Sequence, residues 1–377
     1  MSTQAADAVF AERLDRVRVR MSDQGVDVLM LSVGADLPWL TGYHAMALER
    51  LTMLVVPADG EATMLVPRLE VPRVVERPDV FRVVGWDETD DPIEMTAELA
   101  GPARTAAIGD QTWSRFLVEL LPYMPATAWR RGAEVVAPLR AVKDAAEIDA
   151  LREAAEAVDR VAADLQAGDI PLIGRTEAEV SADIGRRIVA EGHERVNFAI
   201  VAAGANASSP HHHAGSRVIE AGENILFDFG GTFEGGDDGV GYCSDISRCV
   251  FTGEPPAEFR ELYSVLQDAQ AKAVAAATVG TPAEAVDRVA RDLIAVGGFD
   301  GYFIHRIGHG IGVEEHEDPY LVSGNDAPLV AGNAFSVEPG IYVPGRWGAR
   351  IEDIVVATDD GPLALNQASH DLALVEA

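Results

Sequence analysis

The sequence predicts a two-domain α/β protein with a substantial hydrophobic core. A chain of 377 residues usually folds as about two domains, and 48% of its residues are hydrophobic. Apolar runs typical of strands alternate with amphipathic patterns typical of helices. We expect residues 1–138 to form a small mixed-sheet domain and residues 139–377 to form the larger second domain.

The first domain opens with an amphipathic helix over residues 8–24, which Gly25 ends. The apolar face of this helix comprises Phe10, Leu14, Val17 and Met21. Val26–Val33 has the composition of a buried strand. Because residues 36–43 combine a proline with a glycine, we expect them to be a turn-rich strand end.

A hairpin is predicted from residues 51–57 and 61–67, around the Asp-Gly pair at positions 59–60. Strand and helix patterns continue to about residue 137. His44 is the single histidine of this domain, and we expect it to have a structural or surface role. The domain contains no catalytic cluster, so we expect the chemistry in the second domain.

The second domain begins with a junction and a long helix. Residues 139–155 contain the junction and the start of this helix, which Gly168 ends. A capping box formed by Thr176 and Glu179 starts the next helix, which ends at Gly192.

A strand follows at Asn197–Ala203. Two more helices are expected, one starting at Pro256 and one capped by Thr281. Short strands and glycine turns fill residues 302–365.

One pattern of acids and glycines occurs twice in this domain. Asp228 and Glu338 each lie six residues after the glycine of an Ala-Gly pair, and each is followed by a glycine two positions on. Each half then supplies another acid, Asp245 or Glu352. A carboxylate in an apolar strand is costly unless something such as a cation neutralises it. The repeat predicts two βα-type halves that face each other across a shared site.

The charge balance excludes several classes of partner. With 61 acidic and 30 basic residues, the net charge is −31, which argues against nucleic acid because phosphate binding needs a basic surface. No apolar run reaches the roughly 18 residues that would span a bilayer, and no signal peptide is evident. We therefore expect a cytoplasmic protein without membrane contact, with Cys243 and Cys249 reduced.

Six of the nine histidines fall into two groups: His211, His212, His213, His305, His309 and His316. Four carboxylates and an imidazole would form an oxygen-rich set that suits manganese, with cobalt, iron or zinc as alternatives. Four carboxylates balance the charge of two divalent ions, so we expect two metals with a bridging hydroxide. The HExxH zinc motif is excluded because Tyr320 stands where its second histidine would be.

A series of ordered motifs resembles the pita-bread metallopeptidases, specifically the branch of prolidase and aminopeptidase P. The matching runs are PH (210–211), FDFGG (227–231), SDISR (244–248), HRIGHGIG (305–312), EEHE (314–317), VEPGIY (337–342) and RIEDIV (350–355). The DLPWLTGY and LRAVKDAAEI segments resemble the creatinase-like N-terminal domain of that branch. The resemblance covers nearly the whole chain and looks nearest to actinobacterial Xaa-Pro dipeptidases.

This resemblance implies a pita-bread catalytic domain over residues 139–377 and a role for each motif residue. The implied metal ligands are Asp228, Asp245, His309, Glu338 and Glu352. Glu338 would also be the general base, and the implied substrate-handling residues are His211, His305, His316, Tyr342 and Arg350. We expect His316 and His305 to donate hydrogen bonds to the substrate and the oxyanion. For Arg350, pairing with a nearby acid is the alternative.

The implied function is hydrolysis of the Xaa-Pro bond of dipeptides or short peptides by a homodimeric enzyme. The alternatives are an aminopeptidase P that acts on longer peptides, a metal-dependent hydrolase or lyase of a small compound, and a non-enzymatic binding protein. We expect His211 to read the substrate's free carboxylate. The loop at residues 231–244, with Glu234, Asp237 and Asp238, is longer than is usual in the family and could narrow the site.

Overall fold

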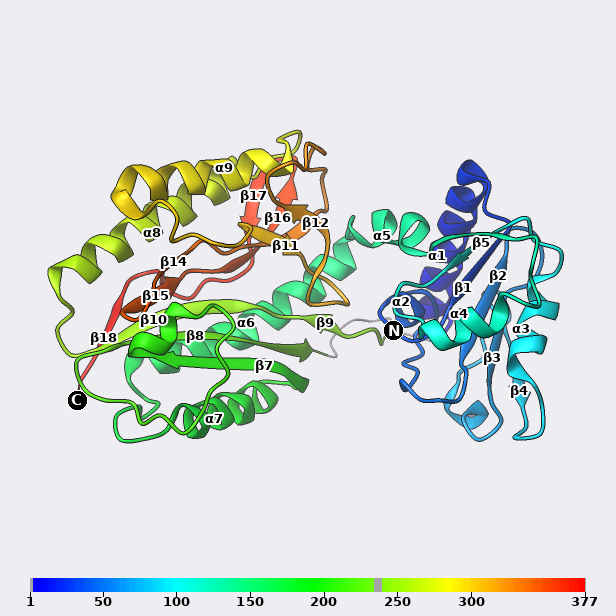
Figure 1. The fold of residues 1–377 in the computed structure, drawn as a ribbon, viewed down its shortest axis with the longest axis horizontal. Helices are drawn as coiled ribbons and strands as arrows, with labels where there is room; N and C mark the ends of the chain where they lie inside the picture. The colour runs from blue at the N-terminus through cyan, green and yellow to red at the C-terminus, as the bar shows by residue number, and fades with distance from the viewer. Residues whose placement is uncertain (1–2, 234–238, 377) are drawn as a thin grey trace. The chain divides into compact units, whose positions relative to one another are not determined.

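The computed structural model describes residues 3–233 and 239–376, which form two compact units. The first unit contains the described residues up to Arg140, and the second contains most of those from Ala141 onward (Figure 1). Among the described residues, no helix is both long and apolar enough to cross a membrane.

The first unit is a six-stranded mixed sheet with helices packed on it. The strands follow the order β4-β3-β2-β1-β5-β6, with β1 antiparallel to β2 and parallel to β5. The helices are α1 (Thr3–Gln24), α2 (Asp36–Thr41), α3 (Pro92–Ala100), α4 (Ser114–Leu120) and α5 (Ala133–Arg140), with a 3₁₀ turn, η1 (Val71–Arg73). The strands are β1 (Val28–Leu31), β2 (Met53–Pro57), β3 (Thr63–Pro67), β4 (Arg82–Trp86), β5 (Thr105–Ile108) and β6 (Ala128–Arg131). The pairing of β2 with β3 confirms the predicted hairpin.

One prediction in this unit is wrong. Residues 36–43 contain the short helix α2 instead of a strand end. Pro38 lies in its first turn, where a missing N–H costs nothing, and Gly42 ends it in the left-handed conformation at φ 72°. Burial of Leu37, Trp39 and Leu40 stabilises a helix that the local pattern alone does not indicate.

Among the described residues, the second unit contains four α-helices and three sheets, two of five strands and one of two strands (Figure 1). The helical elements are α6 (Ala145–Ala167), α7 (Glu177–Ala190), η2 (Gly204–Ser208), α8 (Ala257–Ala276), α9 (Ala283–Ile294) and the π-helical turn η3 (Ala295–Phe299). The strands of the first sheet are β7 (His193–Ala203), β8 (Asn224–Phe233), β9 (Tyr242–Cys243), β10 (Ile246–Thr252) and β18 (Ala373–Val375). The others are β11 (Gly308–Gly310), β12 (Glu317–Leu321), β13 (Ala334–Val337), β14 (Gly340–Val343), β15 (Trp347–Arg350), β16 (Asp353–Thr358) and β17 (Gly361–Ala364).

The helix boundaries follow the predicted caps closely. The capping box of Thr176 and Glu179 starts α7, and Gly168 ends α6 in the left-handed conformation. Two details differ. Pro256 and Pro282 precede α8 and α9 as N-caps without a side-chain hydrogen bond, where we expected Pro256 inside the helix and a cap at Thr281.

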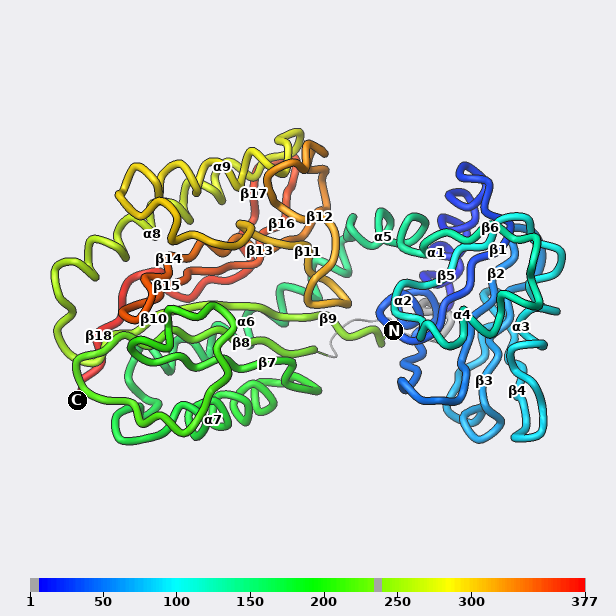
Figure 2. Tube along the Cα trace, viewed as in Figure 1, coloured from blue at the N-terminus to red at the C-terminus, as the bar shows by residue number. Residues whose placement is uncertain are grey.

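The predicted pair of facing halves is present in this unit. β8 pairs antiparallel with β10 in the first half, and β13 pairs antiparallel with β16 in the second. Helices α6 and α7 pack on the first sheet, while α8 and α9 pack on the second half. Ser247 of β10 and Glu352, just before β16, form a backbone bridge that joins the halves. The C-terminal strand β18 completes the first sheet beside β10 (Figure 2).

A close backbone approach fixes η2 against β15. A Cβ added to Gly348 would lie 1.7 Å from the carbonyl oxygen of Ala207, which is far inside contact distance. The amide of Asn224 also donates to the Gly348 carbonyl oxygen at 2.8 Å. Glycine at this position therefore allows η2, and the residues that follow it, to lie on the sheet.

We predict that Gly348→Ala lowers the free energy of unfolding by about 1–3 kcal/mol, because the added methyl group must push η2 away. Chemical denaturation of the metal-free protein measures this change. Gly185→Ala is the control, because its Cβ would make ordinary contact with Val196 and alanine favours the helix that contains it. Equal stability of Gly348→Ala and the wild type would contradict the close packing.

Candidate metal centre

The alternation of β8 places Asp228 on the face that looks toward the second half. Phe227 and Phe229 pack in the core beneath α6 and α7, whereas Leu226 packs in the core shared with α8 and α9. Successive side chains of a strand point to opposite faces, so Asp228 lies on the same face as Leu226. An apolar strand therefore presents one carboxylate to the space between the two sheets.

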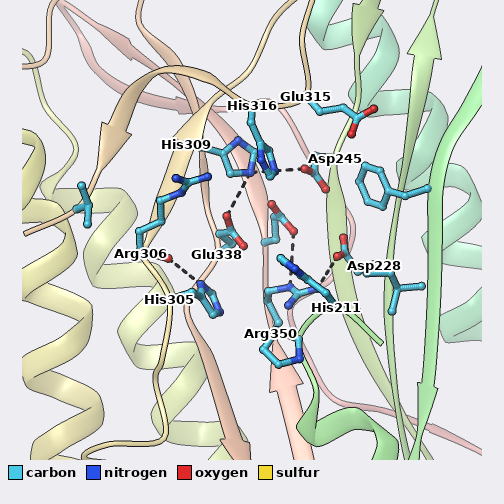
Figure 3. Close-up of a pocket in the computed structure, with 15 residues that line it drawn as sticks. His211, Asp228, Asp245, His305, Arg306, His309, Glu315, His316, Glu338 and Arg350 are labelled. Carbon is cyan, nitrogen blue, oxygen red and sulfur yellow. Dashed lines mark hydrogen bonds and ion pairs between the residues drawn. The ribbon is translucent and has the colours of Figure 1, made fainter. Parts of the chain in front are cut away.

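Four other polar side chains, each at a different strand, reach the same space. Asp245 lies just before β10, His309 is the middle residue of β11, Glu338 directly follows β13, and Glu352 directly precedes β16. His309 Nε2 lies 3.3 Å from Glu338 Oε1 and 3.9 Å from Asp245 Oδ2. Figure 3 shows His309, Asp245, Glu338 and Asp228 turned toward one another. The structure thus brings together all five side chains that the sequence singled out as metal ligands.

The set has the properties of a cation site. Ligand atoms of Asp245, His309 and Glu352 lie within 4.8 Å of one another, and these residues are buried. Among the described residues, Asp228 Oδ1 and Asp245 Oδ1 are buried without a hydrogen-bond partner. A buried carboxylate oxygen without a donor is costly, and a metal ion would remove that cost.

Crowding of like charges adds to this cost. Burial raises the pKa of Asp245 well above its ordinary value, and the charges of Glu352, Asp228 and Glu338 raise it further. Burial likewise raises the pKa of Glu352, together with the charges of Glu338 and Asp228. The residues fit divalent metal ions, because such ions bind carboxylate oxygens and imidazole nitrogens and would offset this repulsion.

Arg350 is the buried cation of the site. Its guanidinium donates to the Oγ of Ser247 and to the hydroxyl of Tyr342, each at 2.8 Å, and pairs with Asp228. It is 2% exposed, so water provides no alternative partner. These contacts agree with the alternative interpretation of Arg350 as the partner of a nearby acid, and its contact with substrate stays a prediction.

Two serines orient the carboxylates, and sequence reasoning missed both. Ser247 Oγ donates to Glu352 Oε2 at 2.7 Å. Ser336 Oγ donates to Glu338 Oε1 at 3.1 Å and accepts from the backbone N–H of His309. Their positions in the sequence motifs could have identified them, since Ser247 belongs to SDISR and Ser336 lies two residues before Glu338.

The carboxylate of Glu338 behaves differently from its neighbours. Burial opposes its ionisation, but the hydrogen bond from His309 and the positive charges of His309, His305 and Arg350 outweigh burial and lower the pKa of Glu338 to about 2. The ring of His309 is oriented by contact of its Nδ1 with the Gly310 carbonyl oxygen at 3.1 Å, which leaves Nε2 facing the carboxylates.

A cavity of about 510 Å³ opens beside these residues. Its size suits a small ligand. Its apolar lining comprises Phe198, Ile200, Pro210 and Val322, and its polar lining includes His211, His305 and His316.

The three predicted substrate-handling histidines differ in their partners. Both nitrogens of His305 are engaged, Nδ1 with the Arg306 carbonyl oxygen at 2.7 Å and Nε2 with the Tyr342 hydroxyl at 2.9 Å. Donation from His305 to a substrate would require one of these bonds to break. The ring centroids of His316 and His309 lie 3.9 Å apart, with the ring planes tilted by 48°. Loss of solvation, with the charge of His309, lowers the pKa of His316 to about 4, although its ring opens to the cavity.

Arg306 also lines the cavity, and sequence reasoning missed it. Its guanidinium lies 4.4 Å from the centre of the Tyr320 ring, which holds it by a cation–π contact. Within residues 3–233 and 239–376, no carboxylate forms an ion pair with it at 4.0 Å or less. Its place between two histidines of the HRIGH run is the signal that could have found it. Glu234, Asp237 and Asp238, which we expected to narrow the site, lie outside the described residues.

The chain is similar to known peptidases along its whole length. The profile of metallopeptidase family M24 matches residues 149–359, and that of the creatinase/prolidase N-terminal domain matches residues 13–142. The probable dipeptidase PepE of Mycobacterium tuberculosis is 43% identical over 383 residues, which cover 100% of this chain and 99% of that protein.

Solved structures give the same result. Dipeptidase PepE from Mycobacterium ulcerans is 43% identical, with a TM-score of 0.91 over 98% of this chain and 99% of its own. The prolidase from Thermococcus sibiricus is 33% identical, with a TM-score of 0.89 over 97% of this chain and 98% of its own.

We predict that Asp245→Asn weakens manganese binding at least about tenfold, because it replaces a charged ligand by a neutral amide. The same change should leave the metal-free protein as stable as the wild type or more stable, since it relieves repulsion from Glu352, Asp228 and Glu338. Metal analysis and thermal unfolding with and without manganese measure both effects. The exposed Asp268→Asn on α8 controls for net charge. Unchanged manganese affinity of Asp245→Asn would exclude Asp245 as a ligand.

Proposed function

The chain belongs to metallopeptidase family M24, and we propose that within this family it hydrolyses the Xaa-Pro bond of dipeptides. The observation that carries this proposal is the convergence of five metal-binding side chains on one cavity of about 510 Å³. Relatives named dipeptidase and prolidase support the substrate class.

We propose that Asp228, Asp245, His309, Glu338 and Glu352 hold two divalent ions. When bound, such ions polarise the scissile carbonyl and lower the pKa of the attacking water. Manganese is the first candidate because four of the five ligands are carboxylates.

Glu338 is proposed as the general base. Its pKa is lowered to about 2, so it is ionised at neutral pH but weakly basic, and transfer of a proton to it would depend on bound metal ions that lower the pKa of the attacking water. The hydroxyl of Ser336 donates to Oε1 and thereby orients the carboxylate. The same carboxylate then returns the proton to the leaving imino nitrogen of proline.

His316 is proposed to stabilise the developing oxyanion. With a pKa lowered to about 4, its imidazole is neutral at pH 7 and keeps one N–H to donate. Its ring faces the cavity beside His309. His305 is proposed to act less directly, by fixing the hydroxyl of Tyr342, which in turn accepts from Arg350.

The lining of the cavity supports the proposed preference for proline and for a short substrate. Phe198, Ile200 and Val322 provide apolar surface for a pyrrolidine ring, which has no N–H to pair. His211 and Arg306 line the same cavity, and either could pair with the free carboxylate of a dipeptide. A longer peptide presents only a neutral amide at that place.

We predict that kcat/KM is higher for Ala-Pro than for Ala-Pro-Ala, by about tenfold or more, because only the dipeptide gains a charge-assisted hydrogen bond. Steady-state kinetics with manganese added to metal-free protein measures the ratio. His211→Ala and Arg306→Gln should each be compared on both substrates. The residue that reads the carboxylate is the one whose loss reduces the dipeptide value more.

Equal or better cleavage of Ala-Pro-Ala would identify an aminopeptidase P instead. No cleavage of either peptide, with metal bound, would favour the small-compound hydrolase or lyase.

We predict that Glu338→Gln lowers kcat by about 10²-fold or more, because an amide cannot accept the proton. Thermal unfolding and metal analysis of the same sample separate this loss from loss of structure or metal. A variant that keeps both its metal and its turnover would show that another group is the base.

A further inference from the structure

One buried carboxylate holds both ends of the segment that carries His211. Glu177, the first residue of α7, is 0% exposed. Its Oε1 accepts from the backbone N–H of Ala203 at 2.9 Å and from the amide of Asn206 at 3.0 Å. Its Oε2 contacts His212 Nε2 at 2.8 Å and accepts from the Gly215 N–H at 3.4 Å. Both ends of residues 203–215 are therefore hydrogen-bonded to the same carboxylate.

Of the four groups that donate to Glu177, His212 is the one next to His211 in the sequence. Its side chain is half-buried and paired with Glu177, whereas we expected both His212 and His213 to be surface histidines. Among the described residues, no other side chain of residues 209–214 makes a hydrogen bond outside that stretch. His211 immediately precedes His212 in the sequence, and its side chain lines the cavity (Figure 3).

The contact is stronger than an ordinary surface pair. Burial opposes ionisation of Glu177, but the hydrogen bonds from Ala203, Asn206 and His212 outweigh it and lower the pKa of Glu177. The carboxylate is thus a buried anion, and each of its hydrogen bonds is charge-assisted. Removing one donor leaves a charged oxygen short of a partner in a place that water reaches poorly.

We propose that the Glu177–His212 pair is a positioning device for His211, so that His212 acts on substrate binding without touching the substrate. The backbone of η2 is fixed at one end by packing on β15. The hydrogen bond of His212 fixes the chain again one residue after His211, which leaves that imidazole little freedom to leave the cavity. This inference rests on the proposed function, because it assigns His211 to the substrate.

The test compares His212→Leu, which removes the donor, with His212→Gln, whose amide can donate the same hydrogen bond. With manganese-loaded enzyme we expect His212→Leu to raise KM for Ala-Pro about fivefold or more, with a smaller change in kcat. We expect His212→Gln to restore most of the loss. His213→Leu is the matched control, because His213 is exposed and has no hydrogen bond among the described residues.

A double mutant separates positioning from general damage. If His212 acts through His211, then His212→Leu adds less than about twofold to KM in a His211→Ala background. An equal effect of His212→Leu in both backgrounds would overturn the inference, as would a His212→Leu enzyme with unchanged KM. Failure of glutamine to rescue would show that the imidazole acts by something other than this hydrogen bond, which also overturns it.

A second readout needs no turnover. Hydrogen exchange of the metal-free protein should be about tenfold faster for amides of residues 207–214 in His212→Leu, and near wild type in His212→Gln. A wild-type enzyme that cleaves no Xaa-Pro peptide would contradict the proposed function. Hydrogen exchange would then decide whether the Glu177–His212 contact holds this segment in place. Exchange that is equal in all three proteins would overturn the anchor itself.

Discussion

The second unit is organised around carboxylates that repel one another in a place with little water. Asp228, Asp245 and Glu352 share this space with Glu338, and burial and mutual repulsion raise the pKa of the first three. Neutral hydroxyl donors and one buried guanidinium reduce the cost without removing it, because two carboxylate oxygens keep no partner among the described residues. A bound divalent cation would offset this repulsion. The facing sheets, together with Ser247, Ser336 and Arg350, hold these carboxylates in fixed positions.

Much of this arrangement could be predicted from sequence because its signals are local. An acid inside an apolar strand, repeated at the same offset 110 residues later, points to a shared cation site without any structure. Glycines and capping boxes likewise mark the ends of α6 and α7. The structure adds the reason, since strand alternation at β8 turns Asp228 toward the other half.

Other features depend on contacts that no local pattern records. Ser247 reaches a carboxylate 105 residues further along the chain, so its role becomes visible only once β10 and β16 lie side by side. The helix α2 forms because Trp39 and Leu40 are buried, which outweighs the turn signals around them. The relevance of Arg306 comes from its surroundings, because no carboxylate among the described residues forms an ion pair with it. The sequence alone does not indicate this.

The spacing of the ligands along the chain has a consequence for how the protein is made. The first of the proposed carboxylate ligands is residue 228 and the last is residue 352, so 352 − 228 = 124 residues separate their synthesis. At roughly 5–20 residues per second, translation of this interval takes on the order of 6–25 seconds. During that time the earlier acids have no partner half, and the site cannot exist. A metal ion that needs ligands from both halves could therefore bind the complete site only after residue 352 has been synthesised.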